Sequence, residues 1–169
     1  MEEELFDIVD ENNQLTGVQK PRSVVHEEGV DWHRTTHIWI VNLKNQVLCQ
    51  QRSLTKDKNP GMWQSFFGGH LSAGQTYFDN AVTELKEELG IVIEPSQLIE
   101  ARMLKSDQAK HFGQVYVLRW DGDISQLRFI DNEVAAVQWM SLDEIRSKMF
   151  QGEFCNVIDP SVEALIKEA

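Results

Sequence analysis

A glycine turn that runs directly into an acidic helix, residues 69–91, constrains this chain more than any other segment. Glu84, Glu87 and Glu88 stand at positions i, i+3 and i+4, so a helix would carry all three carboxylates along one stripe. The spacing predicts a helix over residues 77–89, with its acids turned away from its buried side. The apolar residues of its other face are Phe78, Ala81, Val82, Leu85 and Leu89.

The ends of this helix are also marked. Thr76 followed by Asp79 resembles a capping box, and Gly90 is the residue type expected just past a helix C-terminus. Like charges held so close together repel one another, and a bound cation would offset that repulsion. Carboxylate ligands suit Mg²⁺ or Mn²⁺. The alternative is an acidic face that is simply solvated, as most charged helix surfaces are.

Glycines precede the helix in a pattern that suits a phosphate-handling loop. Gly68, Gly69 and Gly74 supply backbone freedom and allow close approach of a ligand. His70, directly after the glycine pair, is a candidate to contact a substrate phosphate. We therefore expect Gly68, Gly69 and His70 to form a substrate loop beside the acidic helix.

The segment from Gly69 to Ile91 resembles the Nudix box, whose pattern places Gly, Glu, Arg-Glu and Glu-Glu at fixed intervals. Gln75 stands where the family has its first Glu, and Thr83 where it has Arg. The resemblance implies an α/β/α sandwich with a mixed sheet, and Mg²⁺ or Mn²⁺ held by the three helical glutamates. Glu87 or Glu88 is favoured as the catalytic base, and an acid outside the box is the alternative, because family members differ in where the base lies. The positions in register are Gly69, Glu84, Leu85, Glu87, Glu88, Gly90 and Ile91.

Length and charge narrow the class of protein. The 169 residues predict one domain, 1–169, and the mix of 41% hydrophobic and 25% charged residues is that of a globular protein. The net charge of -11 argues against long nucleic acids as partners, because their phosphates would be repelled. A small diphosphate substrate neutralised by a metal ion remains acceptable.

Other features point to the cytoplasm. Cys49 and Cys155 are widely separated and form no CxxC pair, which fits a reducing compartment. The acidic N-terminus lacks the order of a signal peptide, and no apolar run is long enough to span a membrane. We expect a cytoplasmic protein with no membrane partner.

Periodicity and turn signals give the remaining elements and an α/β fold class. An N-terminal hairpin is predicted over 5–9 and 15–18, and its edge could support a homodimer. Further elements are expected as a short helical turn over 21–25, a central hairpin over 33–41 and 46–51, a long hairpin over 98–104 and 113–120, a strand over 134–140, a capped helix from Ser141 to Phe150 and a last helix from residue 160.

Three histidines extend the resemblance toward one branch of the family. His26, His33 and His70, with Trp39 and Trp63, are similar to residues of isopentenyl-diphosphate isomerases, in which the matching histidines help to bind a metal. The resemblance therefore offers these histidines as a second metal site or as pocket-lining groups. The alternative for each is an ordinary polar residue, and nothing in the sequence supports a role for His37 or His111.

Isomerase chemistry itself is not expected. The family's isomerases carry a cysteine where this chain has Gly68, and two later glutamates where we place Phe112 and Gln114. Without a thiol and carboxylates, allylic isomerisation has no evident acid/base pair. We therefore expect a hydrolase that cleaves a phosphoanhydride bond in a nucleoside diphosphate derivative, with the isomerase as one alternative. The other is a binding module of low turnover, which Gln75 and Thr83 keep open.

The polar segment that follows the central hairpin contributes cations. Arg52, Lys56 and Lys58 could contact substrate phosphates, or could simply be solvated. Several aromatic residues could stack on a base, although large apolar side chains are more often core. These are Trp32, Trp63, Phe66, Phe67 and Phe112.

Overall fold

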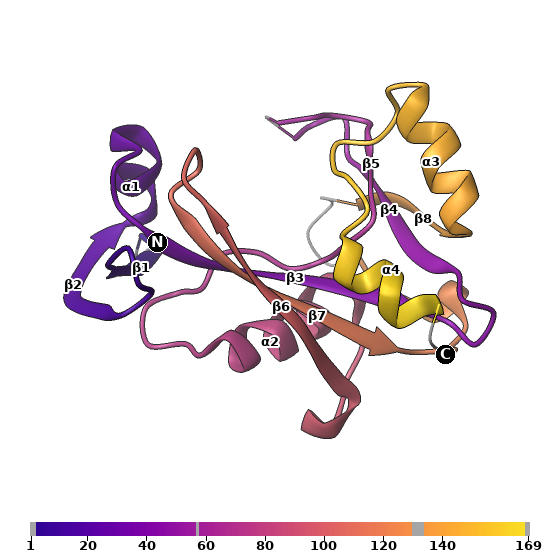
Figure 1. The fold of residues 1–169 in the computed structure, drawn as a ribbon, viewed down its shortest axis with the longest axis horizontal. Coiled ribbons are helices and arrows are strands. Elements are labelled where there is room, and N and C mark those ends of the chain that lie inside the picture. The colour runs from indigo at the N-terminus through magenta and orange to yellow at the C-terminus, as the bar shows by residue number, and fades with distance from the viewer. Residues whose placement is uncertain (1–2, 57, 130–133, 168–169) are drawn as a thin grey trace.

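The computed structural model describes residues 3–56, 58–129 and 134–167 (Figure 1). The strands are β1 (Leu5–Val9), β2 (Leu15–Pro21), β3 (His33–Val41), β4 (Val47–Arg52), β5 (Trp63–Gln64), β6 (Leu98–Ser106), β7 (His111–Arg119) and β8 (Val134–Met140). The helices are α1 (Arg22–Glu28), α2 (Tyr77–Leu89), α3 (Leu142–Phe150) and α4 (Pro160–Lys167), with 3₁₀ turns at Pro95–Gln97 and Ile124–Gln126.

The main sheet is mixed and lies between two helical layers. Its strand order is β5-β4-β3-β7-β6, with β8 paired to β4, and β3 runs parallel to β7 while the other pairs are antiparallel. Helix α2 covers one face of this sheet, and α3 and α4 cover the other (Figure 1). The α/β/α sandwich implied by the sequence resemblance is confirmed.

The central strand β3 explains why both faces are covered. Successive side chains of a strand point to opposite faces. Ile38 and Ile40 therefore join the core against Leu85 of α2, while Trp39 and Val41 join the core of α3 and α4. These four side chains of β3 are all buried, which accounts for the continuous apolar run at the end of the strand.

Helix α2 matches its predicted range of 77–89. The Thr76 side chain accepts from the Asp79 N–H, the Asp79 carboxylate accepts in return from the Thr76 N–H, and Gly90 closes the helix in the left-handed conformation at φ 71°. Buried Ala81, Leu85 and Leu89 hold its inner face on the sheet, so the outer carboxylates stand on a firmly anchored helix.

The predicted central hairpin forms only beside its turn, where β3 and β4 pair antiparallel. Strands β3 and β4 share only the Val41–Val47 pair beside their turn, and then diverge. The edge of β3 that β4 would have occupied is hydrogen-bonded instead to residues 67–74, called the glycine segment below. The Ile38 N–H donates to the Phe67 carbonyl and the Thr36 N–H to the Gly69 carbonyl, both at 2.8 Å. Since each strand edge can form one ladder, pairing with the glycine segment displaces β4, which pairs with β8.

The predicted N-terminal hairpin and the long hairpin of β6 and β7 are both confirmed. Strands β1 and β2 form a separate two-stranded sheet, and α1 packs on it through a small core of Phe6, Ile8 and Val25. This N-terminal unit contacts the glycine segment, because the Ala73 N–H donates to the Leu5 carbonyl and the Gly74 N–H to the Asp7 carboxylate, each at 2.7 Å.

Among the helices of the described residues, none has the length and apolar character needed to cross a membrane.

His37 on β3 gives a prediction about stability. Burial, with a smaller contribution from His111, lowers the pKa of His37 from 6.5 to about 4. Between pH 6.5 and pH 4, His37 is protonated in the unfolded chain but stays neutral in the folded chain. The unfolding free energy should therefore fall as the pH drops from 6.5 to 4, by roughly 2–3 kcal/mol from this group. His37→Gln should flatten that fall in chemical-denaturation curves measured across the window. An unchanged pH dependence in the variant would contradict this assignment.

Candidate active site

A cleft of about 770 Å³ opens between the main sheet, α2 and the N-terminal unit. Two carboxylates of α2, a group of cationic side chains and the glycine pair all line it. The lining residues are Glu4, Arg22, His26, Gln50, Arg52, Thr55, Lys56, Lys58, Gln64, Gly68, Gly69, His70, Glu84 and Glu88. A cleft of this size is typical of small-molecule sites.

The structure separates the three predicted glutamates. Glu84 and Glu88 are half-buried, one helical turn apart, and both line the cleft. Glu87 is exposed and lies outside the lining, because its position turns it toward solvent. The Gly68 N–H donates to Glu88 Oε2 at 3.1 Å, which ties the carboxylate to the glycine pair.

Both glycines make close contacts, with backbone at Gly68 and with a side chain at Gly69. Gly68 has φ 109°, and a Cβ there would lie 2.6 Å from the Thr36 carbonyl oxygen. A Cβ at Gly69 would lie 2.8 Å from Glu84 Oε1. The pair therefore lets the backbone pass close to β3 on one side and to the Glu84 carboxylate on the other.

Gln75, which replaces the first Glu of the Nudix pattern, has a structural role. Its Oε1 accepts from the Ser72 N–H at 2.9 Å and from Asn80 Nδ2 at 3.4 Å. Neither Gln75 nor half-buried Thr83 lines the cleft. The two departures from the pattern thus lie outside the cleft lining.

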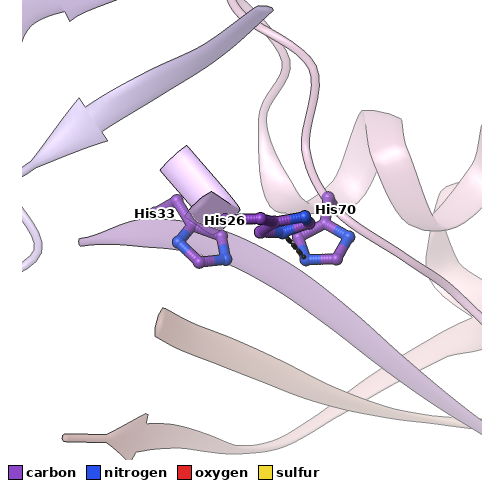
Figure 2. A group of neighbouring side chains, drawn as sticks. All are labelled: His26, His33 and His70. Carbon is purple, nitrogen blue, oxygen red and sulfur yellow. Dashed lines mark hydrogen bonds between the residues drawn. The ribbon is translucent and has the colours of Figure 1, made fainter. Parts of the chain in front are cut away.

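His26, His33 and His70 come together, as the sequence resemblance implied they could (Figure 2). They come from α1, β3 and the glycine segment, and one ring nitrogen from each lies within 4.8 Å of the others. His26 Nε2 and His70 Nε2 are 3.2 Å apart, as the dashed line in Figure 2 shows. Phe6 packs beside all three rings, stacking on His70 with 5.1 Å between centroids.

Burial keeps this cluster neutral. It lowers the pKa of His33 to about 4 and that of His70 to about 2, and it also lowers the pKa of His26, with Arg22 and Lys58 adding to the effect. Neutral imidazoles retain the lone pairs that bind transition metals. The chemistry of the cluster therefore fits a metal that prefers nitrogen ligands.

Sequence reasoning gave no role to His111, yet it lies beside the cluster. It is the direct neighbour of His33 in the parallel pairing of β3 and β7, with ring centroids 5.9 Å apart. A second cavity of about 330 Å³ is lined by His111 together with the three clustered histidines. Only the strand register brings His111 here.

Phe112 and Gln114 stand where we place the two later glutamates of the isomerases. Phe112 packs on Trp32 with 5.0 Å between ring centroids, and Gln114 donates to the Arg102 carbonyl, so neither supplies an acid.

The cationic wall was predicted in part. Arg52, Lys56 and Lys58 line the cleft as expected, whereas Arg22 and Glu4 were missed. Arg22 and Glu4 form an ion pair at 2.9 Å at the base of the N-terminal unit. Their place depends on how that unit packs, for which the sequence offers no local signal. None of the proposed base-stacking aromatics is among the lining residues of the cleft.

Comparison with known families matches residues 31–156 to the NUDIX domain. The chain belongs to the Nudix family. The match begins after the N-terminal hairpin and α1, although Glu4, Arg22 and His26 from that unit line the cleft. The cleft therefore includes side chains from outside the matched residues.

Individual relatives agree with this assignment. Nudix hydrolase 3 of Arabidopsis thaliana is 36% identical over 159 residues, which cover 87% of this chain and 20% of that protein, so the chain spans only a fifth of its length. An isopentenyl-diphosphate Delta-isomerase of Pectobacterium atrosepticum is 31% identical over 146 residues, which cover 84% of this chain and 79% of the isomerase. The crystal structure of DR0079 from Deinococcus radiodurans shares the fold, with a TM-score of 0.77, 21% identity and 98% coverage of both chains.

Proposed function

We propose that this Nudix protein hydrolyses a phosphoanhydride bond in a nucleoside diphosphate derivative, with Mg²⁺ or Mn²⁺ as cofactor. One observation carries the proposal: the carboxylates of Glu84 and Glu88 line the same cleft as a group of cations and the glycine pair. A diphosphate would bind to cations directly and to carboxylates through a metal ion. The cleft offers both partners.

The residues present fit such a metal. Glu84 and Glu88 stand one turn apart on a capped helix, and both offer oxygen ligands toward the cleft. Because Gly69 has no side chain, the Glu84 carboxylate can lie directly beside its backbone; a Cβ at Gly69 would lie 2.8 Å from Glu84 Oε1. When bound there, the metal would lower the pKa of an attacking water and neutralise phosphate charge.

The protein's own groups would do the rest. Arg52, Lys56 and Lys58 would hold the phosphates, and the open backbone of Gly68 and Gly69 would allow the diphosphate to approach closely. A glutamate would take the proton from water; Glu88 is favoured over Glu87 because Glu88 lines the cleft. His70 would contact a phosphate as a neutral hydrogen-bond partner, because burial keeps its pKa low.

The test is turnover on a panel of nucleoside diphosphates, nucleotide sugars and dinucleotides. Release of inorganic phosphate or nucleoside monophosphate is expected with Mg²⁺ or Mn²⁺ and should stop with EDTA. Binding without product release on every member would favour the binding module instead. Exchange of carbon-bound hydrogen in isopentenyl diphosphate, without phosphate release, would favour the isomerase.

We also propose that His26, His33 and His70 form a second metal site that takes a nitrogen-preferring ion such as Zn²⁺ or Ni²⁺. At about a hundredfold excess of metal over the dissociation constant, the unfolding free energy should rise by about 2.7 kcal/mol. Isothermal titration with Ni²⁺ and thermal melts would measure this. The binding should be lost in His26→Gln and kept in His37→Gln, a histidine outside the cluster. Equal binding by the two variants would refute the site.

Two broader expectations also stay proposals. The free thiols of Cys49 and Cys155 support a reducing, cytoplasmic location. The exposed edge strand β2, with Leu15 and Val18 on its surface, could pair with a second copy in a homodimer. Sedimentation at several protein concentrations would decide the oligomeric state.

A further inference from the structure

Asn80 is a buried polar side chain of α2 that the proposed reaction has not used. Its exposed fraction is 2%, and it lies one helical turn before Glu84, on the side of the helix that faces β3 and the glycine segment. A buried amide of this kind must have its hydrogen bonds satisfied. The groups that satisfy it connect Asn80 to the site.

The orientation of the Asn80 amide is fixed by its neighbours. The Thr36 hydroxyl donates to Asn80 Oδ1, and Asn80 Nδ2 donates to the His70 carbonyl oxygen at 3.0 Å. Because a carbonyl oxygen only accepts, the nitrogen must be the atom that faces His70. The same nitrogen then lies 3.4 Å from both Gln75 Oε1 and Glu84 Oε1.

Glu84 Oε1 is therefore held between two groups. On one side is the backbone of Gly69, where a Cβ would come within 2.8 Å, and on the other is the Asn80 amide. Glu88 has a similar arrangement, because its Oε2 accepts from the Gly68 N–H. Glu84 and Glu88 thus each accept a hydrogen bond from a neighbouring group, the Asn80 amide for Glu84 and the Gly68 N–H for Glu88.

We propose that Asn80 is a positioning residue of the metal site: its amide fixes the Glu84 carboxylate and ties it to Gln75 and to the glycine segment. The inference rests on the proposed function, since it assigns Glu84 as a ligand. A group that orients a metal ligand typically changes metal affinity by 10- to 100-fold when it is removed. Asn80 does not line the cleft, so it should act on the metal rather than on the substrate.

The test is Mn²⁺ binding by the 169-residue chain, followed without substrate through the electron paramagnetic resonance signal of free Mn²⁺. Asn80→Leu, nearly the same size but without a donor, should raise the Mn²⁺ dissociation constant about tenfold. Its hydrolytic defect should shrink as Mn²⁺ approaches saturation, with little change in the substrate KM. If Asn80→Leu does not fold, Asn80→Ala provides the same measurement.

Thr36→Val is the matched control. It removes the hydrogen bond at the other end of the same amide and is equally buried, but it leaves the contact between Asn80 and Glu84. It should lower the melting temperature while Mn²⁺ affinity stays close to wild type. Mn²⁺ affinities that fall in both variants in step with stability, or in neither, would overturn the positioning role. A wild-type chain that neither binds Mn²⁺ nor hydrolyses any panel member would instead overturn the proposed function.

Discussion

Glu88→Gln should reduce metal-dependent hydrolysis by roughly a thousandfold, which is about 4 kcal/mol of transition-state stabilisation. The substitution keeps the size of the side chain but removes the charge that would hold the metal and accept a proton. Glu88 lines the cleft and accepts from the Gly68 N–H, so its carboxylate is held in place for this role. Initial rates with Mn²⁺ and the best substrate of the panel would measure the loss.

Glu87→Gln is the control for this experiment. Glu87 is a neighbour in sequence and also lies in the Nudix pattern, but its side chain is exposed and outside the cleft lining. Its rate should stay within a few-fold of wild type. If the two variants lost activity equally, the site would have to extend over the outer face of α2, and the assignment of Glu88 over Glu87 would fail.

Gly68→Cys should destabilise the protein by about 2–4 kcal/mol and should not produce an isomerase. The backbone at Gly68 has φ 109°, which side chains rarely adopt, and the new Cβ would lie 2.6 Å from the Thr36 carbonyl oxygen. That carbonyl belongs to β3 and cannot move without disturbing the sheet. Denaturant unfolding would measure the loss of stability.

Gly74→Ala separates the two causes of that cost. Gly74 also has a positive φ, 83°, but a Cβ there would meet no atom within 4 Å. It should therefore lose only about 1 kcal/mol, the cost of the backbone conformation alone. A Gly68→Cys protein as stable as wild type, or one that exchanges carbon-bound hydrogen in isopentenyl diphosphate, would contradict our account of Gly68. Such exchange is not expected, because Phe112 and Gln114 supply no carboxylate.

The most accurate predictions from sequence concern the segments whose structure is set by near neighbours. The limits of α2 follow from the Thr76–Asp79 capping box, the apolar spacing and Gly90, all within one stretch of chain. The capped start of α3 at Ser141 has the same origin. The mixed sheet flanked by helices was also predicted, from the order of strands and helices along the chain and from the Nudix resemblance.

Strand pairing was less predictable. The sequence favoured a full hairpin of β3 with β4 because the two strands are consecutive. In the structure, most of that edge of β3 is hydrogen-bonded to the glycine segment instead. That choice positions the site, since the ladder with β3 fixes Gly68 and Gly69 beside α2. Competition between distant segments for one strand edge leaves no local signal in the chain.

The sequence by itself determined the acidic helix, the glycine turn and the family, because these depend on spacing along one short segment. Only the tertiary structure decided which glutamates enter the cleft and that Asn80 lies behind Glu84. It also brought Arg22 from the N-terminal unit to the cleft and His111 from β7 to the histidine cluster. The physical reason is the same in each case: a side chain's direction and neighbours are set by packing between segments far apart in the chain, whereas its local conformation is set by residues a few positions away.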